Sequence, residues 1–298
     1  MLHRGWMARP LRALGVIGVA WALVACVAAP GVAPTRTDSP NAPNSPNSVS
    51  TPSNTVVSGA GSRTDLVTAS DETDKQRRAR IRLELASAYF AEGKTETALD
   101  EVKQALVADP NRSAAYNLRG LIYARLDENG LAEDSFRQAL QVAPTDSDAR
   151  HNYAWFLCSQ RRFPEAVAQF RAALEVPQYR GQSKSHFALG VCQARSGDWV
   201  AAEKSLLRSY ELDAGNPATA VNLAEVLMRR GELERARFYV GRVNAEPQYA
   251  NAETLWLAVR IEHLRGNEEG VQSLGEQLRK RFAGSAQAQA FERRKFDE

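Results

Sequence analysis

Small and large apolar side chains recur along residues 77–298 with a period of about 34 residues. Most copies have a small residue at positions 8 and 20 and a larger residue at positions 11 and 24. Small side chains let two helices cross closely and the larger ones fill the remaining space, so each copy predicts one helix–turn–helix unit. The six copies begin at Ala79, Ser113, Ser147, Ser183, Pro217 and Ala252.

Glycine and proline mark the ends of the helices in these units. Proline near position 32, as at Pro110 and Pro144, stops the second helix. Glycine near position 15 permits the turn between the two helices, and it occurs as Gly93, Gly197, Gly231 and Gly266. The whole pattern resembles the tetratricopeptide repeat. It predicts an all-α fold, a right-handed superhelix of six units, whose sixth unit is degraded because it has no following neighbour.

One connection between units is longer than the others. The third unit ends early, at Pro177, and the fourth begins at Ser183, so the spacing there is 36 residues. We expect residues 178–182 to form a surface loop near Tyr179. Such a loop either contacts a partner or is merely tolerated, and the sequence leaves both alternatives open.

The sequence of residues 1–25 has the pattern of a secretory signal peptide. Arg4, Arg9 and Arg12 precede the apolar stretch 13–23, which is too short to span about 30 Å of hydrocarbon as a helix. The following letters LVAC, which end at Cys26, resemble the bacterial lipobox, and this resemblance implies a diacylglycerol on the cysteine thiol. A valine rather than an aspartate comes next, which by the same resemblance favours sorting to the outer membrane. A plain signal peptide with an incidental cysteine is the alternative.

Residues 26–76 predict a disordered tether. They hold six of the thirteen prolines, are rich in Ser, Asn and Thr, and contain no aromatic residue. Such a segment cannot bury enough apolar surface to offset the entropy lost on ordering. We therefore expect it to hold the folded residues 77–298 clear of the membrane.

Charge and residue pattern exclude several classes of function. The 38 Lys and Arg exceed the 35 Asp and Glu by three, which is the number of arginines in the first 25 residues, so a nucleic-acid partner is disfavoured. The chain has no glycine-rich phosphate loop, no nucleophile elbow and no paired histidines at metal-binding spacing. We expect no enzymatic activity, no cofactor, no metal site and no small-molecule substrate.

Two cysteines remain after Cys26. Cys158 and Cys192 fall on the first helices of the third and fourth units, which are neighbours in the predicted array. A periplasmic location permits their oxidation to a disulfide. Two small buried thiols are the alternative, and the sequence does not decide between them.

The first helix of each unit is predicted to line a concave groove with positions 2, 5, 9, 12 and 13. Those positions carry an apolar and aromatic stripe with arginines at its margin, which suits a bound helix or extended peptide. The residues assigned to partner binding are Asn117, Arg125, Asn152, Trp155, Phe187, Arg195, Met228 and Arg229. The stripe also includes Leu83, Phe90, Leu121, His151, Lys184, Val191, Val221, Trp256 and Arg260. For Trp155 and Trp256, packing between units is the alternative to binding.

Four segments resemble one family in particular. They are HNYAWFLC at 151–158, ALEVPQY at 173–179, FALGVCQARSGDW at 187–199 and LWLAVRIEHLRGN at 255–267. With the lipobox and the tether, they resemble the type IV pilus biogenesis lipoproteins of the PilF/PilW family. The resemblance implies a pilotin, which helps the outer-membrane secretin to reach the membrane and assemble into multimers.

The resulting hypothesis is an outer-membrane lipoprotein on the periplasmic face that supports secretin assembly for type IV pili. The repeats alone indicate only a scaffold that binds proteins. The competing hypothesis is therefore a tetratricopeptide adaptor lipoprotein of another envelope machine, for outer-membrane protein insertion or cell-wall synthesis.

Overall fold

The computed structural model describes residues 72–296. The expected signal peptide, the lipidated Cys26 and nearly all of the tether lie outside the described residues. The folded part begins slightly earlier than expected, because helix α1 starts at Asp74 rather than at residue 77. Thr73 caps this helix: its side chain accepts a hydrogen bond from the Gln76 backbone N–H, and the Gln76 side chain accepts one from the Thr73 backbone.

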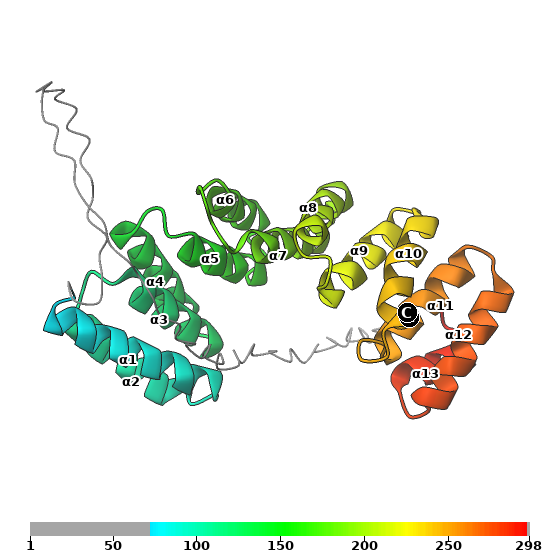
Figure 1. The fold of residues 1–298 in the computed structure, drawn as a ribbon, viewed down its shortest axis with the longest axis horizontal. Coiled ribbons are helices and arrows are strands. Elements are labelled where there is room, and N and C mark those ends of the chain that lie inside the picture. Colours follow the sequence, from blue (N-terminus) through cyan, green and yellow to red (C-terminus); the bar gives the residue numbers. More distant parts are fainter. Residues whose placement is uncertain (1–71, 297–298) are drawn as a thin grey trace, which may run out of the picture. The chain divides into compact units, whose positions relative to one another are not determined.

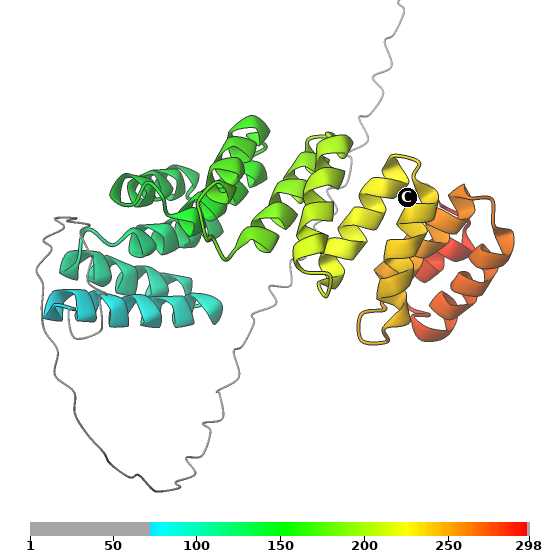
Figure 2. The same ribbon diagram turned by 45° about the horizontal axis from the view of Figure 1, so that its top comes forward.

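Residues 72–296 form thirteen α-helices and no strand, which confirms the all-α prediction over this range. Figure 1 shows the helices following one another in chain order as pairs, and Figure 2 shows the same order from a second direction. The helices are α1 (Asp74–Ala91), α2 (Thr95–Ala108), α3 (Ser113–Arg125), α4 (Asn129–Val142), α5 (Ser147–Ser159), α6 (Phe163–Leu174), α7 (Gln182–Arg195), α8 (Trp199–Leu212), α9 (Pro217–Arg229), α10 (Leu233–Ala245), α11 (Ala252–Leu264), α12 (Glu268–Arg281) and α13 (Ala286–Glu292).

Small residues lie where the two helices of a unit cross. Every alanine at position 8 or 20 of the first five units is fully buried, as at Ala132, Ala154 and Ala166. Where position 8 is Gly120, a methyl group on it would come within 2.7 Å of the Phe136 ring. The helices are therefore as close as the predicted register requires, because no room remains for a larger side chain.

The turn inside each unit needs a left-handed backbone at position 15. Glycine supplies it in four units, and Asp127 and Arg161 adopt the same conformation in the second and third units, with φ of 59° and 61°. These two residues show that the turn geometry is common to units with and without the glycine signal, since the packing of the two helices imposes it.

The sixth unit departs from the repeat pattern because it is covered by an additional helix, which that pattern does not predict. Helix α13 packs against α11 and α12. The Phe291 ring fills the space beside Gly275, at a position where most other units carry a larger apolar residue, so that a side chain at Gly275 would collide with the ring. The glycine that makes this unit look degraded is thus part of a cap on the C-terminal end of the array.

Overpacking these crossings tests the assigned register. We expect Ala132→Leu and Ala166→Leu each to lower the free energy of unfolding by about 1–3 kcal/mol, because neither fully buried site can accept three more carbons without strain. Thermal or denaturant melts measure the loss. Ala168→Leu is the matched control, since Ala168 is exposed on the same helix as Ala166 and should tolerate the change. Unchanged melts for both buried variants would contradict the register.

Candidate partner-binding face

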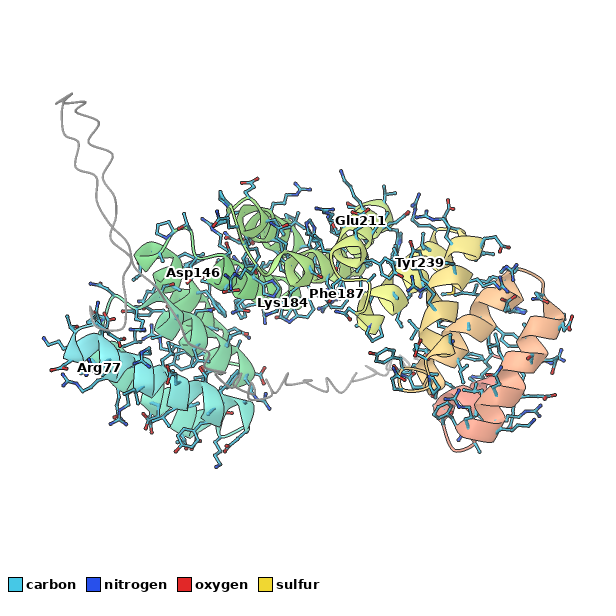
Figure 3. All side chains as sticks on the ribbon, viewed as in Figure 1. Arg77, Asp146, Lys184, Phe187, Glu211 and Tyr239 are labelled. Carbon is cyan, nitrogen blue, oxygen red and sulfur yellow. A yellow bond between two sulfur atoms is a disulfide. The ribbon has the colours of Figure 1, made fainter. Side chains whose placement is uncertain are left out.

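The first helices of the units form the inner side of the array. Each of them packs against the next along the series α1, α3, α5, α7, α9 and α11, whereas no two second helices of residues 72–296 approach each other as closely along their backbones. The second helices α8 and α10 meet through side chains, as where the Tyr239 ring packs edge-on against the Tyr210 ring. The row of units therefore bends toward the first helices, which carry the predicted groove positions. In Figure 3, Lys184 and Phe187 lie on the lower side of α7 and Glu211 of α8 lies on the upper side.

Two asparagine side chains meet across the inner face. The Asn152 Nδ2 donates a hydrogen bond to the Asn117 Oδ1 over 3.1 Å, which joins α5 to α3. The remaining amide N–H groups of Asn117 and the carbonyl oxygen of Asn152 have no partner within residues 72–296. Both side chains are half-buried, so these groups are placed to bind the backbone of an extended segment.

Apolar side chains border this amide pair. Trp155 and Leu121 are half-buried and pack against the core cluster of the third unit. Phe187 and Val191 of α7 are half-buried in the same way and pack against the cluster of the following units. A half-buried ring keeps part of its surface open to a ligand while its core-facing side fixes its orientation.

Three arginines lie along one edge of the inner face, where its helices end. Arg125, Arg195 and Arg229 are exposed and are the last residues of α3, α7 and α9. Each cation is stabilised there by the partial negative charge of its helix C-terminus. Arg125 lies over the Phe90 ring at 5.7 Å and Arg229 over the Trp199 ring at 6.0 Å. The row presents positive charge beside the apolar stripe.

Three residues assigned to the groove are buried instead. Met228 is 5% exposed and packs in a cluster with Leu257 and Ala258 of α11, so its assignment to partner binding is wrong. Trp256 is 8% exposed because the Phe296 ring stacks on it, with ring centroids 5.8 Å apart. The stripe assignment therefore fails where the next first helix or the C-terminal segment covers the position.

The third buried stripe residue is His151. Its Nδ1 lies 2.8 Å from the Ser185 Oγ, and its ring meets the Phe170 ring edge-on. Burial, with a smaller contribution from the nearby Lys184 cation, lowers the pKa of His151 to about 3. The imidazole is neutral at physiological pH and acts as a structural link between α5 and α7.

The long connection after α6 folds back onto this link. The Tyr179 hydroxyl lies 3.0 Å from the Ser185 Oγ, and the absence of a side chain at Gly181 leaves room for the tyrosine ring. The 36-residue spacing signalled the loop, but no sequence pattern signalled the contact between Tyr179, Ser185 and His151. The loop is thus held against α7 by the contact between the Tyr179 hydroxyl and the buried Ser185.

A disulfide joins the same two helices. Cys158 of α5 and Cys192 of α7 are bonded, with their Cα atoms 5.9 Å apart, and neither side chain is exposed. Of the two alternatives that the sequence left open, the structure has the bridge.

The bridge has a measurable consequence. We expect the oxidised protein to show no free thiol at these positions and reduction to lower its melting temperature, since a cross-link between residues 34 apart contributes about 4 kcal/mol in the chain-entropy model. The Cys158→Ala/Cys192→Ala double variant is the control, and its melting temperature should not respond to a reductant. Two thiols titrating in unfolded, non-reduced protein isolated from the periplasm would contradict the bridge.

Clefts also open on the opposite side of the array. One of about 610 Å³ lies between α6, α7 and α8 beside His186, and one of about 530 Å³ lies between α10, α11 and α12 beside Phe238. They open where the backbones of successive second helices lie further apart than those of successive first helices. Their rims mix acidic and basic side chains, as with Lys204 and Glu211.

Neither a metal cluster nor a membrane-spanning helix occurs within the described range. No group of three or more His, Cys, Asp or Glu side chains in residues 72–296 could hold a metal ion. Within the same residues, none of the helices combines the length and apolar character that crossing a membrane requires.

Comparison with known proteins supports the repeat. The sequence matches the tetratricopeptide repeat family over residues 83–149 and 157–217. The type IV pilus assembly protein PilF of Pseudomonas aeruginosa is 28% identical over 222 residues, which cover 74% of this chain and 87% of that protein.

Solved structures agree with this comparison. The crystal structure of PilW, described as a widely conserved type IV pilus biogenesis factor, matches with a TM-score of 0.66 and 30% identity over 71% of this chain and 97% of PilW. The structure of PilF from Pseudomonas aeruginosa matches with a TM-score of 0.65 and 24% identity, over 74% of this chain and all of that one. The predicted tetratricopeptide fold is confirmed.

Proposed function

We propose a function from the premise that the chain belongs to the PilF and PilW family of type IV pilus biogenesis proteins, which are built of tetratricopeptide repeats. Within that process, we assign it the role of a pilotin: a non-enzymatic scaffold that binds subunits of the outer-membrane secretin and supports their assembly into multimers. The observation that carries the proposal is the open inner face of α3, α5 and α7 in a chain of this family.

The chemistry of that face suits a segment of an unassembled subunit. The amide groups of Asn117 and Asn152 would pair with the backbone of an extended segment, and Trp155 and Phe187 would cover its apolar side chains. Arg125 and Arg195 at the rim would favour acidic groups beside the segment. Binding would cover apolar surface on the subunit until it meets its neighbours in the multimer.

The proposal includes a lipid anchor. Acyl chains on Cys26 would hold the protein on the periplasmic face of the outer membrane, with residues 27–71 as the tether. An anchored scaffold raises the concentration of its bound subunits next to the membrane they must enter. This effect would promote multimer formation without any catalytic step.

The alternative is an adaptor role in another envelope machine. An open groove with rings, amides and arginines would also serve a protein of outer-membrane insertion or of cell-wall synthesis. Co-purification from solubilised membranes separates these functions, because either a secretin multimer or a different complex is recovered with the array.

A deletion strain tests the proposal in the cell. Without the protein, we propose that pili are lost and the secretin stays monomeric, and that the wild-type chain restores both. Secretin multimers at the normal level in the deletion strain would reject the pilotin role while leaving membership of the pilus biogenesis family in place.

A further inference from the structure

The two ends of the array differ in how they are covered. At the C-terminal end, α13 packs on α11 and α12, and the Phe296 ring stacks on Trp256. At the N-terminal end, α1 contacts α2 and α3 and no other helix of the described residues. The side of α1 and α2 that looks away from α3 is therefore uncovered within residues 72–296.

This side exposes apolar residues at sites that later units bury. Position 3 of units two to six is at most 5% exposed, and its residues there are small: Ala115, Ala149, Ser185, Thr219 and Thr254. In the first unit the same position is Ile81, which is 45% exposed. Leu85, one turn further along α1, is 42% exposed, although the equivalent position is buried in units three to six. Ile81 and Leu85 thus belong to the surface that a preceding unit would otherwise cover. Val107 of α2 is 84% exposed, at a position that is exposed in every unit.

Basic side chains adjoin these apolar residues. Lys75, Arg78 and Arg82 follow one another at spacings of three and four along one side of α1, which places them in a stripe. Together with Gln104, Val107 and Ala108 of α2 they line a shallow cleft of about 390 Å³. The cleft has a basic wall from α1 and a largely apolar wall from α2.

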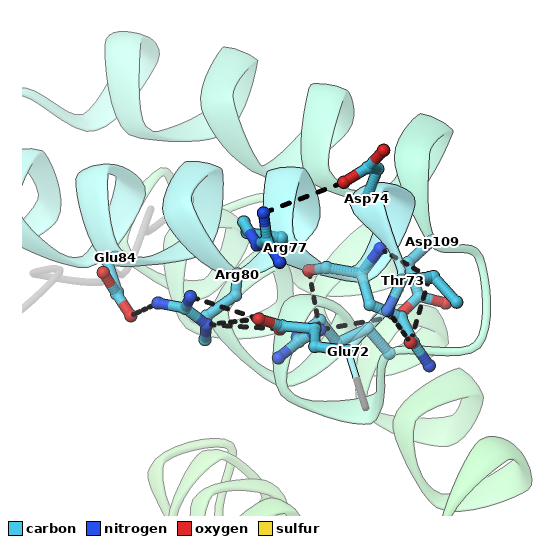
Figure 4. Close-up of polar contacts among 9 residues, drawn as sticks. Glu72, Thr73, Asp74, Arg77, Arg80, Glu84 and Asp109 are labelled. Carbon is cyan, nitrogen blue, oxygen red and sulfur yellow. Dashed lines mark hydrogen bonds and ion pairs between the residues drawn. The ribbon is translucent and has the colours of Figure 1, made fainter. Parts of the chain in front are cut away.

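Ion pairs neutralise the other cations of α1 but leave two uncompensated. Figure 4 shows Arg77 paired with Asp74, and Arg80 paired with Glu72 and Glu84. Arg82 is paired with Glu101 of α2. Lys75 and Arg78 make no ion pair within the described residues. The uncovered side therefore carries net positive charge beside its exposed apolar residues.

We propose that this N-terminal edge, formed by Lys75, Arg78, Ile81, Leu85 and Val107, docks on an anionic phospholipid surface. Cations attract the lipid headgroups, and the three apolar side chains insert at the boundary of the acyl chains. A second copy of the chain fits less well, because two such edges would bring like charges together.

The position of the edge in the chain supports a membrane as its occupant. The chain enters α1 from the tether, and 45 residues, 27 to 71, separate Cys26 from Glu72. As a flexible coil these would span on the order of 40 Å, so an anchored chain would keep this edge near the lipid surface. That nearness rests on the acylation of Cys26 within the proposed function, whereas the composition of the edge does not.

Vesicle flotation tests the docking directly. The chain of residues 27–298 carries all the helices that the structure describes and no acyl chain, so binding does not depend on the lipid anchor. At low salt we expect it to float with vesicles of phosphatidylethanolamine and phosphatidylglycerol but not with phosphatidylcholine vesicles. Lys75→Glu/Arg78→Glu should reduce binding at least tenfold, as should raising the salt concentration. Arg171→Glu/Lys204→Glu is the control, because it makes the same charge change at two exposed cations of α6 and α8 without ion pairs.

Three results would overturn the proposal. The first is an absence of flotation of the parent chain with anionic vesicles, and the second is an equal loss in the two double variants. The third is full vesicle binding by Lys75→Glu/Arg78→Glu combined with loss of secretin capture. That result would show that the edge binds a protein rather than a membrane. The flotation assay contains no secretin, so a negative result there would not contradict the pilotin role. That role is tested separately, by measuring secretin multimers in cells.

Discussion

Under the proposed lipid anchor, Cys26→Ser is expected to detach the protein from the outer membrane almost completely. A hydroxyl cannot replace the thiol that the lipobox resemblance predicts to be acylated, so no acyl chain is added. Each buried methylene contributes about 0.8 kcal/mol to anchoring, and losing several whole chains leaves no stable attachment. The variant should stay uncleaved at the inner membrane or be cut elsewhere and released. Membrane fractionation together with labelling by a radioactive fatty acid measures the effect.

The control for this prediction lies in the tether. Thr35→Ser changes a residue outside the LVAC motif and should leave both the label and the fractionation unchanged. A Cys26→Ser protein that still carries the fatty-acid label and still sediments with the outer membrane would show that the lipobox prediction is wrong.

Trp155→Ala is expected to weaken the proposed secretin binding by more than about 2 kcal/mol, which is roughly a thirtyfold rise in the dissociation constant. Trp155 is half-buried on α5, next to Asn152 and near the middle of the array, where binding energy concentrates in a few anchoring side chains. Titration of purified array with a secretin fragment measures the change. Phe238→Ala is the matched control, since it removes an exposed ring from the outer helix α10.

Stability must be followed alongside this binding measurement. Trp155 also packs against the core of the third unit, so its removal lowers the melting temperature to some extent. Arg195→Glu provides a second variant without that complication, because Arg195 is exposed at the end of α7. If both folded variants bind the secretin fragment with wild-type affinity, the interface lies elsewhere, at the Tyr179 loop or on the side of the second helices.

The steric pattern of the repeat could be predicted from sequence because it depends on neighbours close in the chain. The crossing of two helices within one unit fixes residues such as Ala132 and Ala166, and these sites are fully buried as expected. The turn at position 15 could be predicted in the same way, even though Asp127 and Arg161 adopt its left-handed backbone without being glycines.

Contacts between units were harder to predict. Met228 and Trp256 occupy groove positions in an ideal repeat, yet the next first helix covers one and Phe296 covers the other. Gly275 made the sixth unit resemble a degraded repeat, because the ring that packs against it, Phe291, lies sixteen residues further on and outside the repeat pattern. The sequence placed Cys158 and Cys192 on adjacent helices but could not set the distance between their Cα atoms, which decides whether a disulfide forms.

Site-specific photo-crosslinking tests the central claim most directly. A photoreactive amino acid in place of Leu121, on the inner face beside Trp155, should crosslink to the secretin in living cells. The same probe in place of the exposed Lys204, on the outer helix α8, should not. Secretin crosslinks at Leu121 alone would support the inner face as the binding surface. Secretin crosslinks at Lys204 with none at Leu121 would contradict it.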